Sequence, residues 1–235
     1  VLRGVSDLQA GRTPKADDAF LAAIAGILND DSLNPAFKAS LLTLPTEDYL
    51  ANQMAEEDPI NIHKARKLLR QGIAQRFNRE LRELYQTLRA SHAYQPDADG
   101  MGRRMLKRAA LSYLAALETP ETTTLVKRQF DAADNMTERM DALSLLNGIN
   151  APEREEALAA FYTRFKDDHL VVNKWLTVQA SSPLPNAIAT VRKLMTHPAF
   201  DLKNPNKVRA VVGAFAMSNP VNFHAEDGAG YAFLA

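Results

Sequence analysis

The sequence contains no cysteine, which excludes disulfide bonds, thiol catalysis and zinc sites with thiolate ligands. Lysine plus arginine and aspartate plus glutamate are equal at 28 each, so no net charge attracts a nucleic acid or an anionic membrane. No apolar run approaches the roughly 20 residues of a membrane-spanning helix. The composition, 46% hydrophobic and 24% charged, is that of an ordinary globular protein. We therefore expect a cytoplasmic location, with no nucleic-acid or membrane partner.

Motifs for catalysis and metal binding are also missing. The His-Glu-x-x-His pattern, which places two zinc-binding imidazoles and a glutamate base on one helix face, does not occur. No serine lies in a Gly-x-Ser-x-Gly or Ser-x-x-Lys setting, and both glycine-rich phosphate-binding patterns are absent. We therefore expect no catalytic residue, metal ligand or cofactor in this chain. The five histidines are far apart in the sequence: His63, His92, His169, His197 and His224.

No segment alternates with the period of a strand, and the apolar residues instead recur at helical spacing. Several helices are expected to begin where a capping side chain precedes proline, because the cap accepts free amide hydrogens and proline has none to satisfy. The longest periodic segment runs from Ile60 to about Ala90. The pattern predicts an all-α protein. The capped starts are Asn34-Pro35, Asp58-Pro59, Thr119-Pro120 and Asn204-Pro205.

The chain is long enough for one large domain, and we predict a single helical domain over residues 1–235. Residues 94–102 contain Pro96 and two glycines, so they are predicted to form a loop and the only candidate sub-boundary. From about residue 105, the helices come in antiparallel pairs of roughly 30 to 35 residues without a recurring consensus. This spacing favours an irregular right-handed array of antiparallel helix pairs, a HEAT/ARM-like α-solenoid, over a four-helix bundle.

The most unusual stretch is residues 204–231, which read NPNKVRAVVGAFAMSNPVNFHAEDGAGY. Arg209 lies outside the apolar stripe of its helix, so the sequence alone favours an arginine in solvent or in a surface ion pair. His224, Glu226 and Asp227 could form a ligand cluster, but neighbouring residues seldom point at one ion. We instead expect Asp227 or Glu226 to accept backbone hydrogen bonds at a helix end. The predicted core stripe is Val208, Val211, Val212, Phe215 and Ala216.

A run of basic residues raises the possibility of a nucleic-acid track. Aromatic stacking residues do not alternate with these charges, and the net charge is zero, so a solvated helix face is the favoured interpretation. Trp175 and Phe130 are predicted to be core residues. The basic residues are Lys64, Arg66, Lys67, Arg70, Arg76, Arg79, Arg82, Arg103, Arg104, Lys107 and Arg108.

The stretch 204–231 resembles the C-terminal helical domain of the bacterial aminopeptidase N family, a group of gluzincin-type zinc aminopeptidases. Family members carry a segment of the form N-P-N-x-(I/V)-R-x-(L/V)-(I/V)-G-A-F-A-x-S-N-P-x-x-F-H-A-E-D-G-x-G-Y, and this sequence has it with few departures. Supporting pieces extend the resemblance along nearly the whole chain. These are Leu42-Thr43-Leu44-Pro45, Lys127-Arg128-Gln129-Phe130, Asp134-Asn135-Met136-Thr137, Asn173-Lys174-Trp175 and Gln179-Ala180.

The resemblance implies a non-catalytic domain of a larger zinc metallopeptidase of the membrane alanyl aminopeptidase class, which releases amino-terminal residues from peptides. Zinc and the catalytic residues would belong to the catalytic domain of the same polypeptide, which would be the partner of this chain. This domain would cover that catalytic domain and enclose a chamber that limits access to peptide substrates. The chain would be truncated at its C-terminal end and inactive alone, and the parent would be a monomer. Arg209 matches an arginine that faces the chamber, and His224, Glu226 and Asp227 are further candidate chamber residues.

Two alternatives remain open from the residues alone. A stand-alone helical-repeat module would bind a protein unrelated to any peptidase. A nucleic-acid binder would show salt-dependent association through the basic run.

Overall fold

The computed structural model describes residues 1–89 and 94–235, and this part of the chain contains helices and no strand, which confirms the all-α prediction. The chain forms two compact units, Val1–Asp141 and Ala142–Ala235. The division falls within helix α9 (Met136–Leu146). Residues 94–102, the candidate sub-boundary, lie inside the first unit. His92 and the helix end predicted near Ala90 lie outside the described residues.

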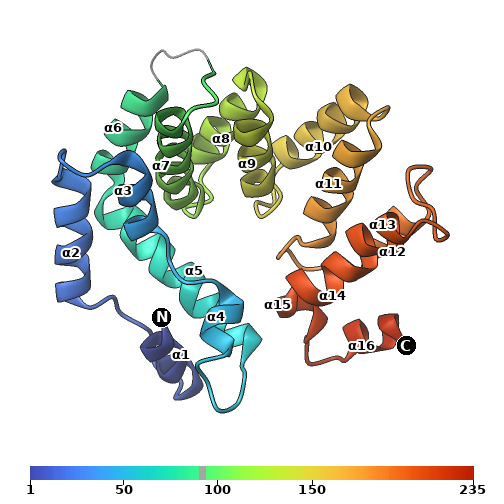
Figure 1. Ribbon diagram of the computed structural model, residues 1–235. Coiled ribbons are helices and arrows are strands. Elements are labelled where there is room, and N and C mark those ends of the chain that lie inside the picture. The colour runs from blue at the N-terminus through green and yellow to red at the C-terminus, as the bar shows by residue number, and fades with distance from the viewer. Residues whose placement is uncertain (90–93) are drawn as a thin grey trace. The chain divides into compact units, whose positions relative to one another are not determined.

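The first unit is built around α7, which packs against α3, α5, α6 and α8 (Figure 1). A smaller cluster of Val5, Leu50, Ile62 and Ala65 joins α1, α4 and α5. Its helices are α1 (Leu2–Gln9), α2 (Asp18–Asn29), α3 (Pro35–Leu42), α4 (Glu47–Ala51), α5 (Pro59–Arg76), α6 (Asn78–Arg89), α7 (Ala98–Ala115) and α8 (Pro120–Ala132).

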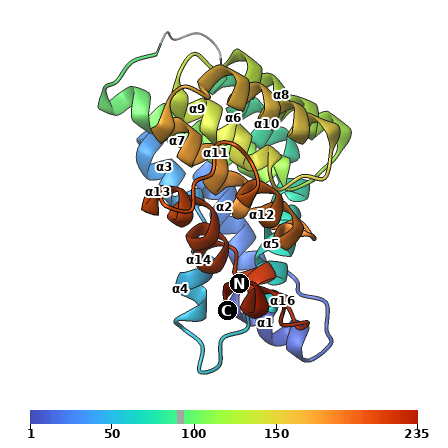
Figure 2. The ribbon, with the colours of Figure 1, turned by 90° about the vertical axis from the view of Figure 1, so that its right-hand side faces the viewer.

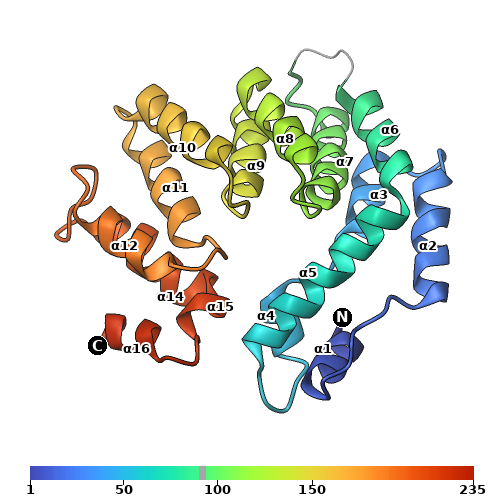
Figure 3. The ribbon, with the colours of Figure 1, turned by 180° about the vertical axis from the view of Figure 1, so that it is seen from behind.

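Two features of this unit differ from the sequence prediction. The periodic segment that begins at Ile60 is two helices, because Phe77 between α5 and α6 has non-helical angles of φ −117° and ψ 30° (Figure 3). The predicted loop 94–102 is helical from Ala98, since the Asp97 side chain caps the new helix by accepting 2.7 Å from the Gly100 amide. The cap at Asp97 is local chemistry that hydrophobic periodicity does not register, and the break at Phe77 leaves no mark in the hydrophobic pattern either.

Glycine allows the close approach of α3 and α7. A Cβ added to Gly102 would lie 3.0 Å from the Ala36 backbone nitrogen, a tight contact that α3 could accommodate only by moving away by a few tenths of an ångström. Farther along the same pair, the Tyr113 hydroxyl donates to the Leu42 carbonyl oxygen. Gly102 therefore has a packing role inside a helix, where the sequence suggested a loop residue.

The second unit is organised around α11, which packs against α10, α12, α13, α14 and the π-helical turn η1. Trp175 on α11 is 7% exposed, and its indole nitrogen donates 2.9 Å to the Leu158 carbonyl oxygen, as a core position requires. The helices are α10 (Pro152–Phe165), α11 (His169–Ala180), α12 (Ala187–Met195), α13 (Pro205–Val208), η1 (Arg209–Gly213), α14 (Ala214–Ser218), α15 (Pro220–Phe223) and α16 (Ala229–Leu234).

Residues 205–218 form one continuous helical path through α13, η1 and α14 (Figure 2). The π-helical turn in the middle holds more residues per turn than an α-helix, which shifts the side chains that face inward. Of the predicted stripe, Val211 and Phe215 are buried, whereas Val208, Val212 and Ala216 are only half-buried. Lys207 takes an inward position with 6% of its surface exposed.

Candidate functional site

The segment 204–231 begins as its sequence predicts. The Asn204 side chain accepts 3.0 Å from the Asn206 amide, and Pro205 occupies the first helical position. The buried Lys207 ammonium follows, and desolvation lowers the pKa of this lysine. Lys207 is therefore a buried cation of this segment, two positions before the exposed Arg209.

Arg209 is the first residue of the π-helical turn and points away from the core, because its neighbours Ala210 and Val211 are buried while it is exposed. Within the described part of the chain, no hydrogen bond or ion pair to its guanidinium is recorded. Single π turns inside α-helices occur frequently at functional sites. The structure thus presents Arg209 as an exposed cation that is open to a ligand.

His224, Glu226 and Asp227 lie in the turn between α15 and α16. The His224 Nδ1 atom and the Tyr231 hydroxyl are 2.5 Å apart, and the Asp227 carboxylate accepts 3.0 Å from the Ala229 amide. Glu226 is exposed. Asp227 therefore has the backbone-capping contact expected from the sequence. No hydrogen bond or ion pair joins Arg209 to any of these three side chains among the described residues.

Gly228 and Gly230 shape this turn in different ways. Gly228 has a φ of 67°, the left-handed region that favours glycine. Gly230 packs so closely that an added Cβ would lie 2.1 Å from the Phe223 carbonyl oxygen. The two glycines thus hold α16 against α15.

The described residues do not fit a zinc ion. Within residues 1–89 and 94–235, no group of three or more histidine, cysteine, aspartate or glutamate side chains is arranged to hold a metal. His224, Glu226 and Asp227 do not form a ligand cluster. His224 is hydrogen-bonded to Tyr231, and the Asp227 carboxylate accepts from a backbone amide. Neighbours in sequence do not converge here on a common point.

A buried polar network, which the sequence did not predict, holds the start of α15 in place. The Asn219 side chain is 2% exposed and donates to the carbonyl oxygens of Ala180 at 3.1 Å and Ser182 at 2.7 Å. The Ser182 hydroxyl in turn donates 2.8 Å to the Asn147 carbonyl oxygen. Asn219 therefore links the start of α15 to the end of α11, a long-range contact that the sequence does not reveal.

The basic run of the first unit is largely engaged in contacts within that unit. Arg70 donates 2.6 Å to the Ser112 carbonyl oxygen, and Arg66 donates 2.8 Å to that of Pro45. These contacts favour the structural interpretation of the run over a nucleic-acid track. The ion pairs are Lys67 with Glu118, Arg82 with Glu121, Lys107 with Glu138, and Arg108 with Asp141.

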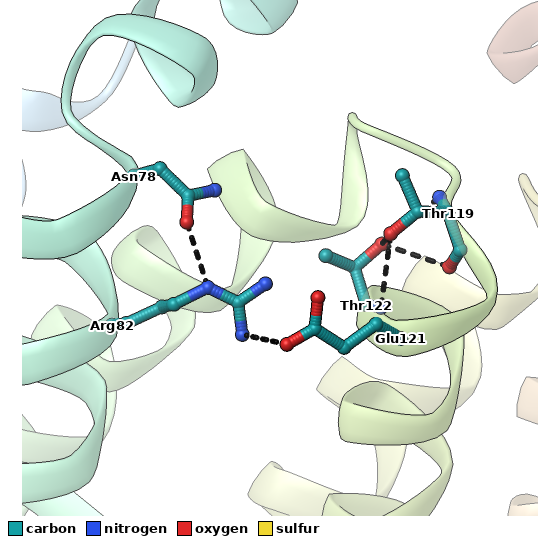
Figure 4. A network of polar contacts seen from close by, with 5 residues as sticks. All are labelled: Asn78, Arg82, Thr119, Glu121 and Thr122. Atoms are coloured by element: carbon teal, nitrogen blue, oxygen red, sulfur yellow. Dashed lines mark hydrogen bonds and ion pairs between the residues drawn. The ribbon is translucent and has the colours of Figure 1, made fainter.

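Figure 4 shows one of these contacts at the junction of α6 and α8. The Arg82 guanidinium donates 2.7 Å to the Asn78 side-chain oxygen and forms an ion pair with the Glu121 carboxylate at 3.1 Å. Beside them, Thr119 and Thr122 form a capping box at the start of α8. Arg82 is thus oriented toward a neighbouring helix.

None of the helices in the described part is both long enough and apolar enough to span a bilayer. The packed helix pairs define a helical-repeat domain. The chain belongs to the family described as a domain of unknown function, DUF3458_C, with ARM repeats, which matches residues 1–235.

Similar proteins agree with this assignment. Aminopeptidase N of Escherichia coli (strain K12) is 38% identical over 217 residues, which cover 92% of this chain and 24% of that protein. Aminopeptidase N of Caulobacter vibrioides is 38% identical over 219 residues, which cover 93% of this chain and 25% of that protein. The chain therefore spans about a quarter of the length of these curated relatives.

A solved structure resembles the fold closely. It is Legionella pneumophila aminopeptidase A in complex with aspartic acid, with a TM-score of 0.88 and 33% identity, covering 99% of this chain and 28% of that one. The resemblance to the helical domain of aminopeptidase N that the sequence predicted is thereby confirmed.

Proposed function

We propose that this chain is the non-catalytic C-terminal domain of a zinc-dependent aminopeptidase N that releases amino-terminal residues from peptides. The observation that carries the proposal is the match of nearly the whole chain to about a quarter of aminopeptidase N. The catalytic domain of the same polypeptide is then the partner of this domain. In this proposal, zinc and its ligands belong to that partner.

In this proposal the domain covers the catalytic domain and encloses a substrate chamber. A closed chamber excludes folded proteins and removes water from around the reacting groups, which strengthens electrostatic interactions there. The parent is a cytoplasmic monomer that acts on short or unfolded peptides.

Arg209 has a specific role in the chamber. Its guanidinium is exposed and, among the described residues, has no recorded ionic partner, so it is available to a carboxylate. A bound short peptide carries a free carboxylate that this cation attracts. His224, Glu226 and Asp227 line the same chamber, where His224 and Asp227 also stabilise the turn between α15 and α16.

Kinetics of the parent enzyme test this role. The Arg209→Ala variant is expected to raise KM for alanyl dipeptides by about 3- to 10-fold, with little change in kcat or in thermal stability. The matched control is Arg164→Ala, which removes another exposed arginine from the same unit. An unchanged KM accompanied by lost stability would show that Arg209 is structural.

A second measurement tests whether the peptide carboxylate is the group that Arg209 attracts. Blocking the peptide carboxylate as an amide should abolish the difference between the parent enzyme and Arg209→Ala. If the variant discriminates equally against amidated and free peptides, then the carboxylate is not the group that Arg209 attracts.

A further inference from the structure

Helix α3 in the first unit has the reverse polarity of an ordinary surface helix. Surface helices turn apolar side chains inward and charged side chains to solvent. In α3 the single charged residue, Lys38, is 5% exposed, whereas Phe37 and Leu41 are 56% and 41% exposed. The lysine ammonium is satisfied inside, because it donates 2.9 Å to the Leu28 carbonyl oxygen and 3.2 Å to that of Asp30. The outer side of α3 is therefore apolar and carries no charge.

Helices α3 and α7 lie side by side and run in the same direction (Figure 1). A Cβ added to Gly102 of α7 would lie 3.3 Å from the Ala36 Cβ of α3. Farther along both helices, Tyr113 reaches the Leu42 carbonyl oxygen. The line of contact between the helices therefore follows these two contacts, and side chains that lie to the same side of it share one face of the unit.

Four exposed apolar side chains share such a face. Each residue advances about 100° around a helix, which turns Met101 and Met105 of α7 to one side of the contact line and Phe37 and Leu41 of α3 to the same side. The two methionines are 55% and 47% exposed. Single exposed apolar side chains are normal, but a contiguous group marks an interaction surface. We call these four residues the α3–α7 face.

The polar groups beside the α3–α7 face already have partners within the unit. Ser40 is the only other exposed residue of α3, and its hydroxyl donates 3.0 Å to the Ala36 carbonyl oxygen. Arg108, one turn beyond Met105, is paired with Asp141 at 3.3 Å. A partner can therefore remove water from this face without leaving a buried donor or charge unpaired. Phenylalanine and methionine without charges are typical of the centre of a protein–protein interface.

The length of the related proteins indicates what covers this face. The matched segments make up 24% and 25% of the two aminopeptidase N relatives, and the same fold makes up 28% of the solved aminopeptidase A chain. In each of these proteins the fold therefore occurs beside a much longer stretch of its own polypeptide. We propose that the α3–α7 face docks the first unit onto the catalytic domain of the same polypeptide. This assignment rests on the proposed function, which names that domain as the partner.

Oxidation of methionine by hydrogen peroxide measures whether the face is covered, because the rate depends on exposure of the thioether. The complete polypeptide is compared with this 235-residue chain. Met101 and Met105 are expected to oxidise readily in the chain and at least ~10-fold more slowly in the complete polypeptide. Equal rates in the two proteins would overturn the proposal.

Photo-crosslinking identifies the occupant. Benzoylphenylalanine at position 37 of the complete polypeptide is expected to cross-link to the domain that carries the zinc ligands, with a yield that does not change on dilution. Cross-links between two copies, which decrease on dilution, would assign the face to self-association and overturn the proposal. Cross-links in an active enzyme that never reach the catalytic domain would refute this docking alone, whereas a complete polypeptide without zinc-dependent peptidase activity would refute the proposed function.

A charge placed in the face tests the same contact. Phe37→Asp is expected to raise the oxidation rate of Met101 about 10-fold in the complete polypeptide and to leave it unchanged in the 235-residue chain, since a carboxylate resists burial. Leu170→Asp is the matched control, because Leu170 is a 74% exposed leucine on α11 of the second unit, and it should change neither rate. Phe37→Ser serves if Phe37→Asp does not fold. Unchanged protection of Met101 in the complete polypeptide would contradict the proposal.

Discussion

The Tyr113 hydroxyl on α7 donates a 2.6 Å hydrogen bond to the carbonyl oxygen of Leu42, the last residue of α3. Both residues are buried, at 2% and 1% exposure, so water cannot replace either partner. The bond satisfies one of the free carbonyl groups at the end of α3. It therefore joins two helices through residues that lie 71 positions apart in the sequence.

Stability is expected to fall at high pH partly through Tyr113. Burial raises its pKa to about 12, so the folded state holds the proton more tightly than the unfolded state, where the pKa is near 10. The contribution is complete below pH 10 and is lost as the pH rises from 10 toward 12. Two pKa units correspond to about 2–3 kcal/mol. Urea unfolding at pH 7 to 11 should show a smaller alkaline decline for Tyr113→Phe, with Tyr85, whose pKa burial also raises to about 12, responsible for the remainder. An identical decline in both proteins would contradict this account.

Asn219→Ala is expected to destabilise the second unit by about 2–3 kcal/mol, because it leaves the carbonyl oxygens of Ala180 and Ser182 buried without this donor. Fluorescence of Trp175, the single tryptophan, reports unfolding of this unit directly. Asn222→Ala is the control. Its amide donates 3.2 Å to the Ser182 carbonyl oxygen and 2.9 Å to the Asn219 side-chain oxygen, but it is half-buried and its loss leaves the contact between Asn219 and Ala180 in place, so we expect a smaller loss of about 1 kcal/mol. Equal losses in the two variants would count against the network.

Gly230→Ala is expected to displace α16, since the added Cβ would lie 2.1 Å from a backbone oxygen of Phe223, which cannot rotate away. Amide hydrogen exchange should show lost protection in α15 and α16. Gly26→Ala on α2 is the matched control, because a Cβ there meets no atom within 4 Å. That substitution should stabilise its helix by about 0.5–1 kcal/mol. Unchanged protection in Gly230→Ala would mean that α16 does not pack as described.

Thr119→Ala should cost about 1 kcal/mol, because it removes the capping box of α8. Glu121→Ala should cost below about 0.5 kcal/mol, since this carboxylate is 75% exposed and its pair with Arg82 is screened by water. Urea titrations in low and high salt distinguish the two. Only the Glu121 effect should shrink with salt.

Much of the helical architecture could be predicted because its signals are local. Asn204, Asp58 and Thr119 each cap a helix that begins with proline, and the structure places all three caps as expected. Phe130 and Trp175 are buried, as their helical spacing predicts. Helix caps and helical spacing depend on residues that are close in the sequence, so they can be recognised without the tertiary structure.

The rest depends on tertiary contacts that no spacing reveals. The break at Phe77 and the π-helical turn that begins at Arg209 alter the register without a proline, and the one glycine in that turn, Gly213, is its last residue. The short helix α1 was not predicted, and it forms where Val5 packs into the cluster with Leu50. Gln129 was noted only as part of a family motif, since the burial of its side-chain oxygen, without a hydrogen-bond partner among the described residues, is apparent only once the surrounding helices are in place.

The most direct test of the proposed function compares this chain with the complete polypeptide from its native gene. Both are purified under identical conditions and assayed with an alanyl chromogenic substrate at a series of zinc concentrations. We expect zinc-dependent hydrolysis by the complete polypeptide and none by the 235-residue chain. Hydrolysis by the chain that increases with zinc and persists through rigorous purification, or a complete polypeptide that has no peptidase activity, would contradict the proposal.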